Sequence, residues 1–164
     1  MKIWFDTEFI EDGKTIDLIS IGLVCEDGIS YYAENSDCNL EMASPWVREN
    51  VIQFLQGDDK PRRVIADEII RIVGDKPEFW AYYADYDWVV LCQLYGTMMD
   101  LPKGWPMYCR DLKQWADSLG NPKLPENMKA HHALDDALWV RSSWEFLSNV
   151  EKMSKGDAHV VVKY

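Results

Sequence analysis

The fold is decided near the start of the chain, by residues 2–33, KIWFDTEFIEDGKTIDLISIGLVCEDGISYYA. Residues 2–5 are apolar and β-prone, and residues 16–25 form a longer run of the same kind, so both predict strands. Asp27-Gly28 is a dipeptide typical of a hairpin turn, and residues 29–33 return as a third strand. Three strands so close in sequence predict a sheet to which the rest of the chain adds.

The remaining residues alternate between helical and strand patterns. A helix is predicted over residues 42–55, with Ser44 as N-cap and Pro45 at the first helical position. This order predicts an α/β domain over residues 1–150, with a mixed five-stranded sheet flanked by helices. Residues 151–164 form a C-terminal tail whose pattern fits a strand, a partner-binding segment or a disordered one. The other predicted segments are helices at 62–73, 87–95, 112–119 and 131–146, strands at 79–83 and 107–110, and a loop at 120–129.

Length and charge limit the classes of function. The chain has 164 residues, typical of one domain, and 48% of them are apolar, which excludes a disordered chain. Its formal net charge of −11 excludes a protein that coats long nucleic acid through a broad basic face. It does not exclude a protein that grips a nucleic-acid end, because bound divalent cations invert the charge of carboxylate clusters.

Neither the cysteines nor the apolar runs indicate a zinc site, a disulfide framework or a membrane span. The four cysteines show no C-x-x-C pair and no zinc-ligand spacing with the histidines, so we expect packed, reduced thiols. The charged Lys2 precedes any apolar signal segment, and no run approaches the about 20 apolar residues of a membrane span. We therefore expect a cytoplasmic protein without a membrane partner.

Two acids follow the first predicted strand. Side chains at positions i and i+2 of a strand point to the same face, so Asp6 and Glu8 converge at one end of the sheet. Like charges at this distance repel unless a cation lies between them, and Mg²⁺ prefers carboxylate oxygens. The pair indicates a metal site, although two solvated acids at a strand end have the same pattern.

Two later segments bring further acids. Residues 84–88, ADYDW, follow the fourth predicted strand and open a helix, where one acid can be an N-cap and the other can face the strand ends. Residues 131–137, HHALDDA, offer a histidine as general base and an acid that completes a cation site. An acidic helix start beside surface histidines has the same pattern. Spacing alone does not decide which acids and which histidine are used.

Together the three segments resemble the DEDDh branch of the DnaQ-like exonuclease superfamily. The resemblance implies an RNase H-like fold and 3′→5′ hydrolysis of phosphodiester bonds, with release of nucleoside 5′-monophosphates. It also implies two divalent ions, Mg²⁺ or Mn²⁺, with a histidine that deprotonates the attacking water. The family's first motif is similar to Asp6-Thr7-Glu8, its second to Tyr86-Asp87, and its third to His131, Ala133, Leu134, Asp136 and Ala137. The implied catalytic residues are Asp6, Glu8, Asp87, His131 and Asp136, and the four acids among them are the implied metal ligands.

Shorter stretches are similar to a small stand-alone exoribonuclease subfamily of that branch, at residues 6–13, 19–22 and 91–96. This resemblance implies an RNA substrate with a single-stranded 3′ end and is compatible with a homodimer. The sequence departs from the subfamily at residues 80–83, where Trp-Ala-Tyr-Tyr stands in place of the usual His-Asn stretch.

The terminal base also needs a contact surface. Phe9 and Ile10, directly after the first motif, are the predicted substrate-binding residues, because base–aromatic stacking contributes about 1–3 kcal/mol. Trp88 and Tyr82 are weaker candidates, since both are more typical of a core. Arg110, Lys113 and Lys129 can hold phosphates, although a solvated surface position is the commoner role. Two other interpretations remain, a DNA-trimming exonuclease with the same site and a catalytically idle RNase H-like interaction module.

Overall fold

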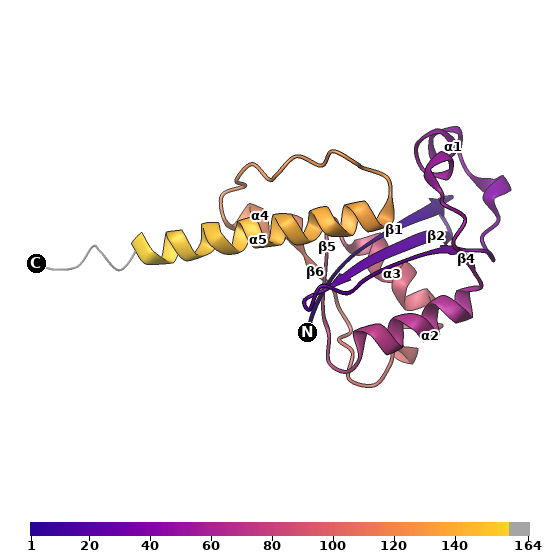
Figure 1. The fold of residues 1–164 in the computed structure, drawn as a ribbon, viewed down its shortest axis with the longest axis horizontal. Helices are drawn as coiled ribbons and strands as arrows, with labels where there is room; N and C mark the ends of the chain where they lie inside the picture. Colours follow the sequence, from indigo (N-terminus) through magenta and orange to yellow (C-terminus); the bar gives the residue numbers. More distant parts are fainter. Residues whose placement is uncertain (158–164) are drawn as a thin grey trace, which may run out of the picture.

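The computed structural model describes residues 1–157, which form a mixed sheet with helices on both faces (Figure 1). Its strands are β1 (Lys2–Glu11), β2 (Ile16–Cys25), β3 (Ser30–Asn35), β4 (Asp59–Lys60), β5 (Glu78–Ala81) and β6 (Arg110–Asp111). They lie in the order β4-β3-β2-β1-β5-β6. β2 is antiparallel to both β1 and β3, whereas β1 and β5, β5 and β6, and β3 and β4 are parallel pairs.

The predicted α/β class with a mixed sheet is confirmed, but the sheet has six strands rather than five. The additional strand, β4, has two residues and pairs with the end of β3, and so short a strand carries no alternating pattern. β1 is longer than predicted because it pairs with β2 as far as Glu11. Its polar residues beyond Phe5 conceal this continuation in the sequence.

The described residues form five α-helices: α1 (Pro45–Asn50), α2 (Arg62–Val73), α3 (Asp85–Gln93), α4 (Leu112–Ser118) and α5 (Ala133–Asp157). The helix predicted over residues 42–55 is broken into α1 and two flanking 3-10 turns. Its predicted N-cap is confirmed, since the Ser44 hydroxyl accepts a hydrogen bond from the Val47 backbone N–H. α5 was expected over residues 131–146, but it begins at Ala133 and continues well past the sheet (Figure 1).

Alternate side chains of β1 enter two different cores. Ile3 and Phe5 belong to a buried cluster with residues of α2 and α3, whereas Trp4 belongs to a cluster with residues of α4 and α5. The same alternation directs Asp6 and Glu8 toward the α5 side of the sheet and the residue between them toward α3. Asp6 and Glu8 therefore lie at the edge of the hydrophobic core on the α5 side of the sheet.

A third, smaller cluster fixes the segment that contains α1. Ile10 and Ile19 of the sheet pack there with Ala43 and Val51, which flank α1. α1 is thereby held beyond the carboxyl end of β1 (Figure 1). This placement lets α1 form a wall beside the acids.

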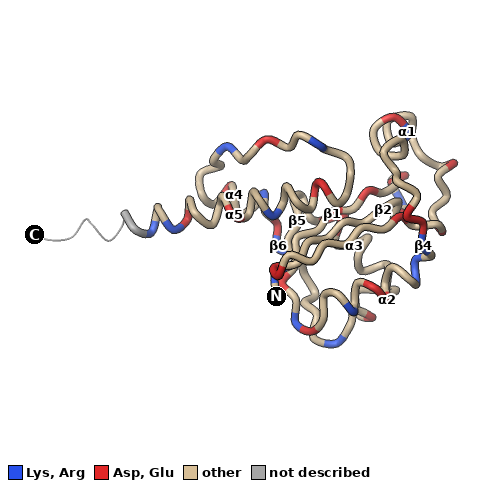
Figure 2. Tube along the Cα trace, viewed as in Figure 1, with Lys and Arg blue, Asp and Glu red and all other residues tan. Residues whose placement is uncertain are grey.

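The predicted boundary between domain and tail at residue 150 falls inside α5, so residues 151–157 are helical. Residues 158–164, the rest of the predicted tail, lie outside the described residues. Lys and Arg are scattered along the chain rather than gathered on one element (Figure 2). All four cysteines are free thiols, as predicted. No helix within residues 1–157 is long and apolar enough to cross a membrane.

Candidate active site

The acids of β1 lie where this strand has lost one neighbour. β5 pairs with β1 only from Lys2 to Trp4, while β2 remains paired with the other edge of β1. Beyond Trp4, the edge of β1 that faces β5 is open, and its backbone N–H groups are available to other partners. A side chain from a helix can therefore reach the strand next to Asp6 and Glu8.

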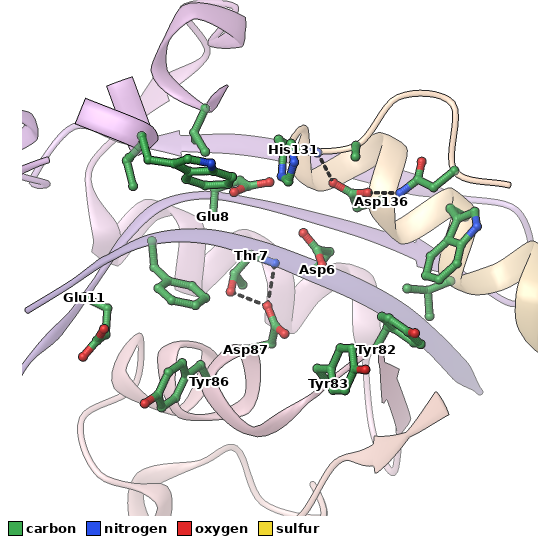
Figure 3. A pocket seen from close by; sticks show the side chains of 18 of the residues that line it. Asp6, Thr7, Glu8, Glu11, Tyr82, Tyr83, Tyr86, Asp87, His131 and Asp136 are labelled. Atoms are coloured by element: carbon green, nitrogen blue, oxygen red, sulfur yellow. Dashed lines mark hydrogen bonds between the residues drawn. The ribbon is translucent and has the colours of Figure 1, made fainter. Parts of the chain in front are cut away.

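Asp87, at the start of α3, occupies this open edge (Figure 3). Its Oδ1 accepts one hydrogen bond from the Thr7 backbone N–H (2.9 Å) and another from the Thr7 hydroxyl (2.6 Å). The Asp87 side chain is buried, whereas Asp85 is exposed. Thr7 thus uses both of its donors to fix one carboxylate oxygen of Asp87.

The start of α5 approaches the sheet at Gly22, which pairs with Asp6 across β1 and β2. A Cβ atom at Gly22 would lie 2.3 Å from backbone atoms of Ala133 and Leu134, far inside van der Waals contact. Glycine is therefore required for this close approach. The approach in turn sets the distance between Asp136 on α5 and the acids of β1.

The Asp136 side chain stabilises the turn before α5 by hydrogen bonds. Its carboxylate accepts hydrogen bonds from the backbone N–H groups of His131 (2.7 Å) and His132 (3.2 Å), and a third from the Asn127 side chain. Asp135 instead lies 3.4 Å from the His132 ring nitrogen Nδ1. The neighbouring acids of this segment therefore have different surroundings.

The two histidines also face different ways. His131 lines the cavity, and its ring meets that of Trp46 edge-to-face with centroids 5.0 Å apart. Its φ of 74° lies in the left-handed region, which is uncommon for a residue other than glycine. His132 stacks on Tyr32 at 4.6 Å, and its Nε2 lies 2.9 Å from the Gln56 side-chain nitrogen. His131 is therefore the histidine that is presented to the cavity.

The structure brings all five predicted catalytic residues to one cavity of about 790 Å³, lined by Asp6, Glu8, Asp87, His131 and Asp136. This volume falls within the range of about 300–1,000 Å³ typical of ligand pockets. Carboxylate oxygens of Asp6, Glu8 and Asp136 lie within 4.8 Å of one another. Such a group of oxygens has the spacing of a cation site.

Burial and the proximity of other carboxylates raise the pKa values of three acids in the cavity. Burial raises the pKa of Asp6 well above its ordinary value, and the neighbouring carboxylates raise it further. Burial, followed by the charges of Asp136 and Asp87, raises the pKa of Glu8 to about 8. Burial also raises the pKa of Asp87 to about 6, against the hydrogen bonds from Thr7, which lower it. Among the described residues that line the cavity, none is Lys or Arg.

Aromatic side chains line the cavity on both sides of the acids (Figure 3). On one side, the rings of Phe9 and Tyr86 meet edge-to-face with centroids 5.8 Å apart. On the other side, the rings of Tyr82 and Tyr83 are 4.6 Å apart, and Tyr82 meets Trp139 at 4.9 Å. The cavity thus has an acidic centre between two aromatic surfaces.

The two predicted contacts to a substrate base have different positions. Phe9 lines the cavity, but Ile10 is buried in the cluster beneath α1, so the prediction that Ile10 packs on the terminal base is corrected. Phe9 and Ile10 are neighbours on β1, so their side chains point to opposite faces of the sheet. Trp88 packs in the core against Phe79.

The three cations considered for phosphate contacts lie outside the cavity lining. Each has an acidic partner: Arg110 pairs with Glu78 (3.5 Å), Lys113 with Asp117, and Lys129 with Asp135 (3.6 Å).

Sequence reasoning missed several residues that shape the site. The role of Thr7 could have been predicted, because a strand residue between two acids faces the opposite side of the sheet, where another element must pack. Gly22 lies in a β-rich run, and a glycine inside a strand indicates a close backbone approach. Trp46 had no such signal because it lies far from the motifs in sequence, and Asn127 had none because it lies in the loop before the third motif, where no helical or strand period applies.

Comparison with known proteins agrees with this geometry. A family model described as the 3′-5′ exoribonuclease Rv2179c-like domain matches residues 1–148. Two curated relatives from Mycobacterium tuberculosis are 3′-5′ exoribonuclease Rv2179c of strain H37Rv and 3′-5′ exoribonuclease MT2234.1 of strain CDC 1551. Each is 38% identical to this chain, over 96% of this chain and 99% of its own length.

Solved structures show the same fold at much lower sequence identity. Two structures of exonuclease I match with TM-scores of 0.62 and 0.61, at 13% and 11% identity, over 85% and 93% of this chain. This chain spans 39% and 42% of those longer chains. The fold likeness confirms the predicted RNase H-like architecture. The family match over residues 1–148 and the two near-full-length relatives show that the chain belongs to the Rv2179c-like 3′-5′ exoribonuclease family.

Proposed function

We propose that this protein is a metal-dependent 3′→5′ exoribonuclease that hydrolyses phosphodiester bonds at a single-stranded 3′ end of RNA and releases nucleoside 5′-monophosphates. The proposal is carried by one observation: four acids and a histidine from three distant segments of the chain line a single cavity. The two relatives are named 3′-5′ exoribonucleases, which supports the choice of RNA.

Divalent cations fit this cavity. Asp6, Glu8 and Asp136 offer carboxylate oxygens within 4.8 Å of one another, and no Lys or Arg among the described lining residues balances their charge. Burial, followed by the charges of Asp136 and Asp87, raises the pKa of Glu8 to about 8, and a bound cation would relieve the repulsion between these carboxylates. These acids, together with Asp87, would hold Mg²⁺ or Mn²⁺, and two ions is the number implied by the family resemblance. When bound, the ions would stabilise the negative charge that develops on the phosphate oxygens.

His131 is the proposed general base. Its imidazole lines the same cavity as the acids, and its contact with Trp46 restricts the orientation of the ring. From this position it takes a proton from the water molecule that attacks the terminal phosphodiester. Because the His131 backbone N–H is bound to Asp136, the base and this carboxylate are held in a fixed relation.

The surroundings of the cavity favour a chain end over a continuous strand. On the Phe9 side the cavity is lined by Ser44, Trp46 and Val47 of the α1 segment, which form a wall. With a net charge of −11, the protein lacks the excess of basic residues that binding along many phosphates requires. Contact limited to a few terminal nucleotides agrees with both observations.

The test is digestion of a 5′-labelled RNA duplex with a 3′ overhang in the presence of Mg²⁺ or Mn²⁺. Asp136→Asn and Asp135→Asn form a matched pair, since the two residues are adjacent on α5 but only Asp136 lines the cavity. We expect the wild type and Asp135→Asn to shorten the RNA from its 3′ end and to release mononucleotides. Asp136→Asn, or a chelator, should slow this reaction by orders of magnitude.

Three other outcomes would contradict the proposal in different ways. Equal losses in Asp135→Asn and Asp136→Asn would contradict the assignment of the site. A ladder on matched DNA but not on RNA would favour a DNA-trimming exonuclease. Degradation of neither nucleic acid by a folded protein would favour an interaction module without activity.

A further inference from the structure

The two residues that follow β5 are aromatic and reach the cavity. Tyr82 and Tyr83 directly follow β5 and line the cavity on the side of the acids opposite to Tyr86 (Figure 3). The Tyr82 and Tyr83 rings are 4.6 Å apart at an interplanar angle of 65°. Tyr82 also meets the ring of Trp139 on α5 at 4.9 Å and 88°. The turn after β5 and helix α5 thus contribute three rings to one aromatic surface.

Hydrogen bonds within the protein fix the segments that carry this aromatic surface. The Asp111 carboxylate at the end of β6 accepts a hydrogen bond from the Ala84 backbone N–H (2.7 Å), which fixes the turn directly after Tyr83. The Trp139 indole N–H donates to the Pro125 carbonyl oxygen (2.9 Å). Tyr83 nevertheless remains 62% exposed, and its φ of 55° lies in the left-handed region, where bulky residues are rare. A fixed but exposed ring is suited to stacking on a ligand rather than to packing a core.

The two sides of the cavity are lined by different elements. On the Phe9 side the α1 segment contributes Ser44, Trp46 and Val47, whereas the opposite side ends at Tyr83, the most exposed aromatic residue of the lining. A 3′-terminal nucleotide has no chain beyond it and fits the walled side, so the rest of the RNA leaves past Tyr83.

We propose that Tyr83, backed by Tyr82 and Trp139, is the stacking platform for the base of the penultimate nucleotide, on the 5′ side of the cleaved bond. The proposal rests on the exoribonuclease function proposed above, because that reaction puts one nucleotide on each side of the acids. Every base has a π-face, so the platform accepts any base that is unpaired. A penultimate nucleotide inside a duplex cannot offer its face, and hydrolysis therefore slows as the enzyme approaches a paired region.

The test compares three single-stranded RNA oligonucleotides of one sequence. One is intact, one lacks the base of its penultimate nucleotide, and one lacks a base farther upstream. The measured quantity is kcat/KM for removal of the terminal nucleotide with Mg²⁺ present. Loss of one stacking contact predicts that the wild type cleaves the penultimate-abasic RNA about 10-fold more slowly than the intact RNA. The RNA with the upstream lesion should react at nearly the intact rate.

Variants then assign the effect to the platform. In Tyr83→Ala the ratio of kcat/KM for intact RNA to kcat/KM for penultimate-abasic RNA should fall to about 1, because the ring that stacks on the base has been removed. Tyr83→Phe keeps the ring and should keep the ratio. Tyr108→Ala removes another exposed tyrosine, one outside the cavity lining, and should also keep it.

Failure of this inference is separable from failure of the proposed function. A wild-type enzyme that cleaves intact and penultimate-abasic RNA equally fast overturns the platform alone, and no variant has to fold for this result. A Tyr83→Ala enzyme that retains the full ratio also overturns it. A wild type that leaves all three RNAs intact overturns the exoribonuclease function and the platform with it.

Discussion

The crowding of carboxylates predicts that replacing Glu8 by glutamine stabilises the metal-free protein at alkaline pH. The pKa of Glu8 is raised from 4.5 to about 8, first by burial and then by Asp136 and Asp87. The folded protein therefore holds this proton more tightly than the unfolded chain does. Its stability falls as the pH rises from 4.5 to about 8, where the folded state is forced to ionise Glu8. Glutamine occupies the same volume and carries no charge to be lost or gained.

The magnitude follows from the size of the shift. At about 1.36 kcal/mol per pH unit, the full shift corresponds to about 5 kcal/mol. Glu8 is partly exposed, and water screens its charge, so a realistic contribution is about 1–3 kcal/mol. For a domain of this size, each kcal/mol moves Tm by about 2–4 °C. Glu8→Gln should therefore raise Tm by about 2–12 °C in chelator at a pH above the raised pKa.

The assay is thermal unfolding followed by circular dichroism in chelator, below pH 4.5 and above pH 8, the two limits of the shift. Glu41→Gln, at an exposed glutamate far from the acids, is the control and should leave Tm unchanged at both pH values. Added Mn²⁺ should stabilise the wild type more than Glu8→Gln, because a ligand of the ion has been removed. A Glu8→Gln protein that melts at or below the wild-type temperature in alkaline chelator would show that ionised Glu8 does not destabilise the metal-free fold.

Three further predictions concern residues that position the site. Gly22→Ala forces a Cβ into the backbone of Ala133 and should cost about 1–3 kcal/mol of stability and about 100-fold in kcat, measured by urea unfolding and nucleotide release; wild-type values for both would contradict the close approach. Thr7→Val removes the hydroxyl donor to Asp87 and should cost about 1–3 kcal/mol. The same change should move the acidic limb of the pH–rate profile to higher pH, because the Thr7 hydroxyl lowers the pKa of Asp87, and an unmoved limb would argue against this role. His131→Asn should lower kcat by about 10²–10⁴-fold while Mn²⁺ binding by calorimetry persists, and an enzyme that keeps its rate would rule out His131 as the base.

Local patterns in the sequence were sufficient wherever a feature depends on neighbouring residues. Strand alternation put Asp6 and Glu8 on one face, and the cap at Ser44 was recognised from the residues that follow it. The same patterns were insufficient where a remote partner decides the outcome. β1 continues past Phe5 because β2 pairs with it, and the two residues of β4 form a strand only because β3 lies beside them.

Sequence patterns alone predict the α/β class, the order of the elements and the three segments that carry the acids. Within those segments, spacing alone left two pairs of acids and one pair of histidines undecided. The family resemblance implied Asp87, His131 and Asp136, and the tertiary structure brings these three residues to the cavity. The hydrogen bonds between Thr7 and Asp87 join residues 80 positions apart. No helical or strand period records such a contact, because periodicity reports the geometry of one element. A site depends instead on which elements the sheet order brings together, and here that order leaves the edge of β1 open beyond β5.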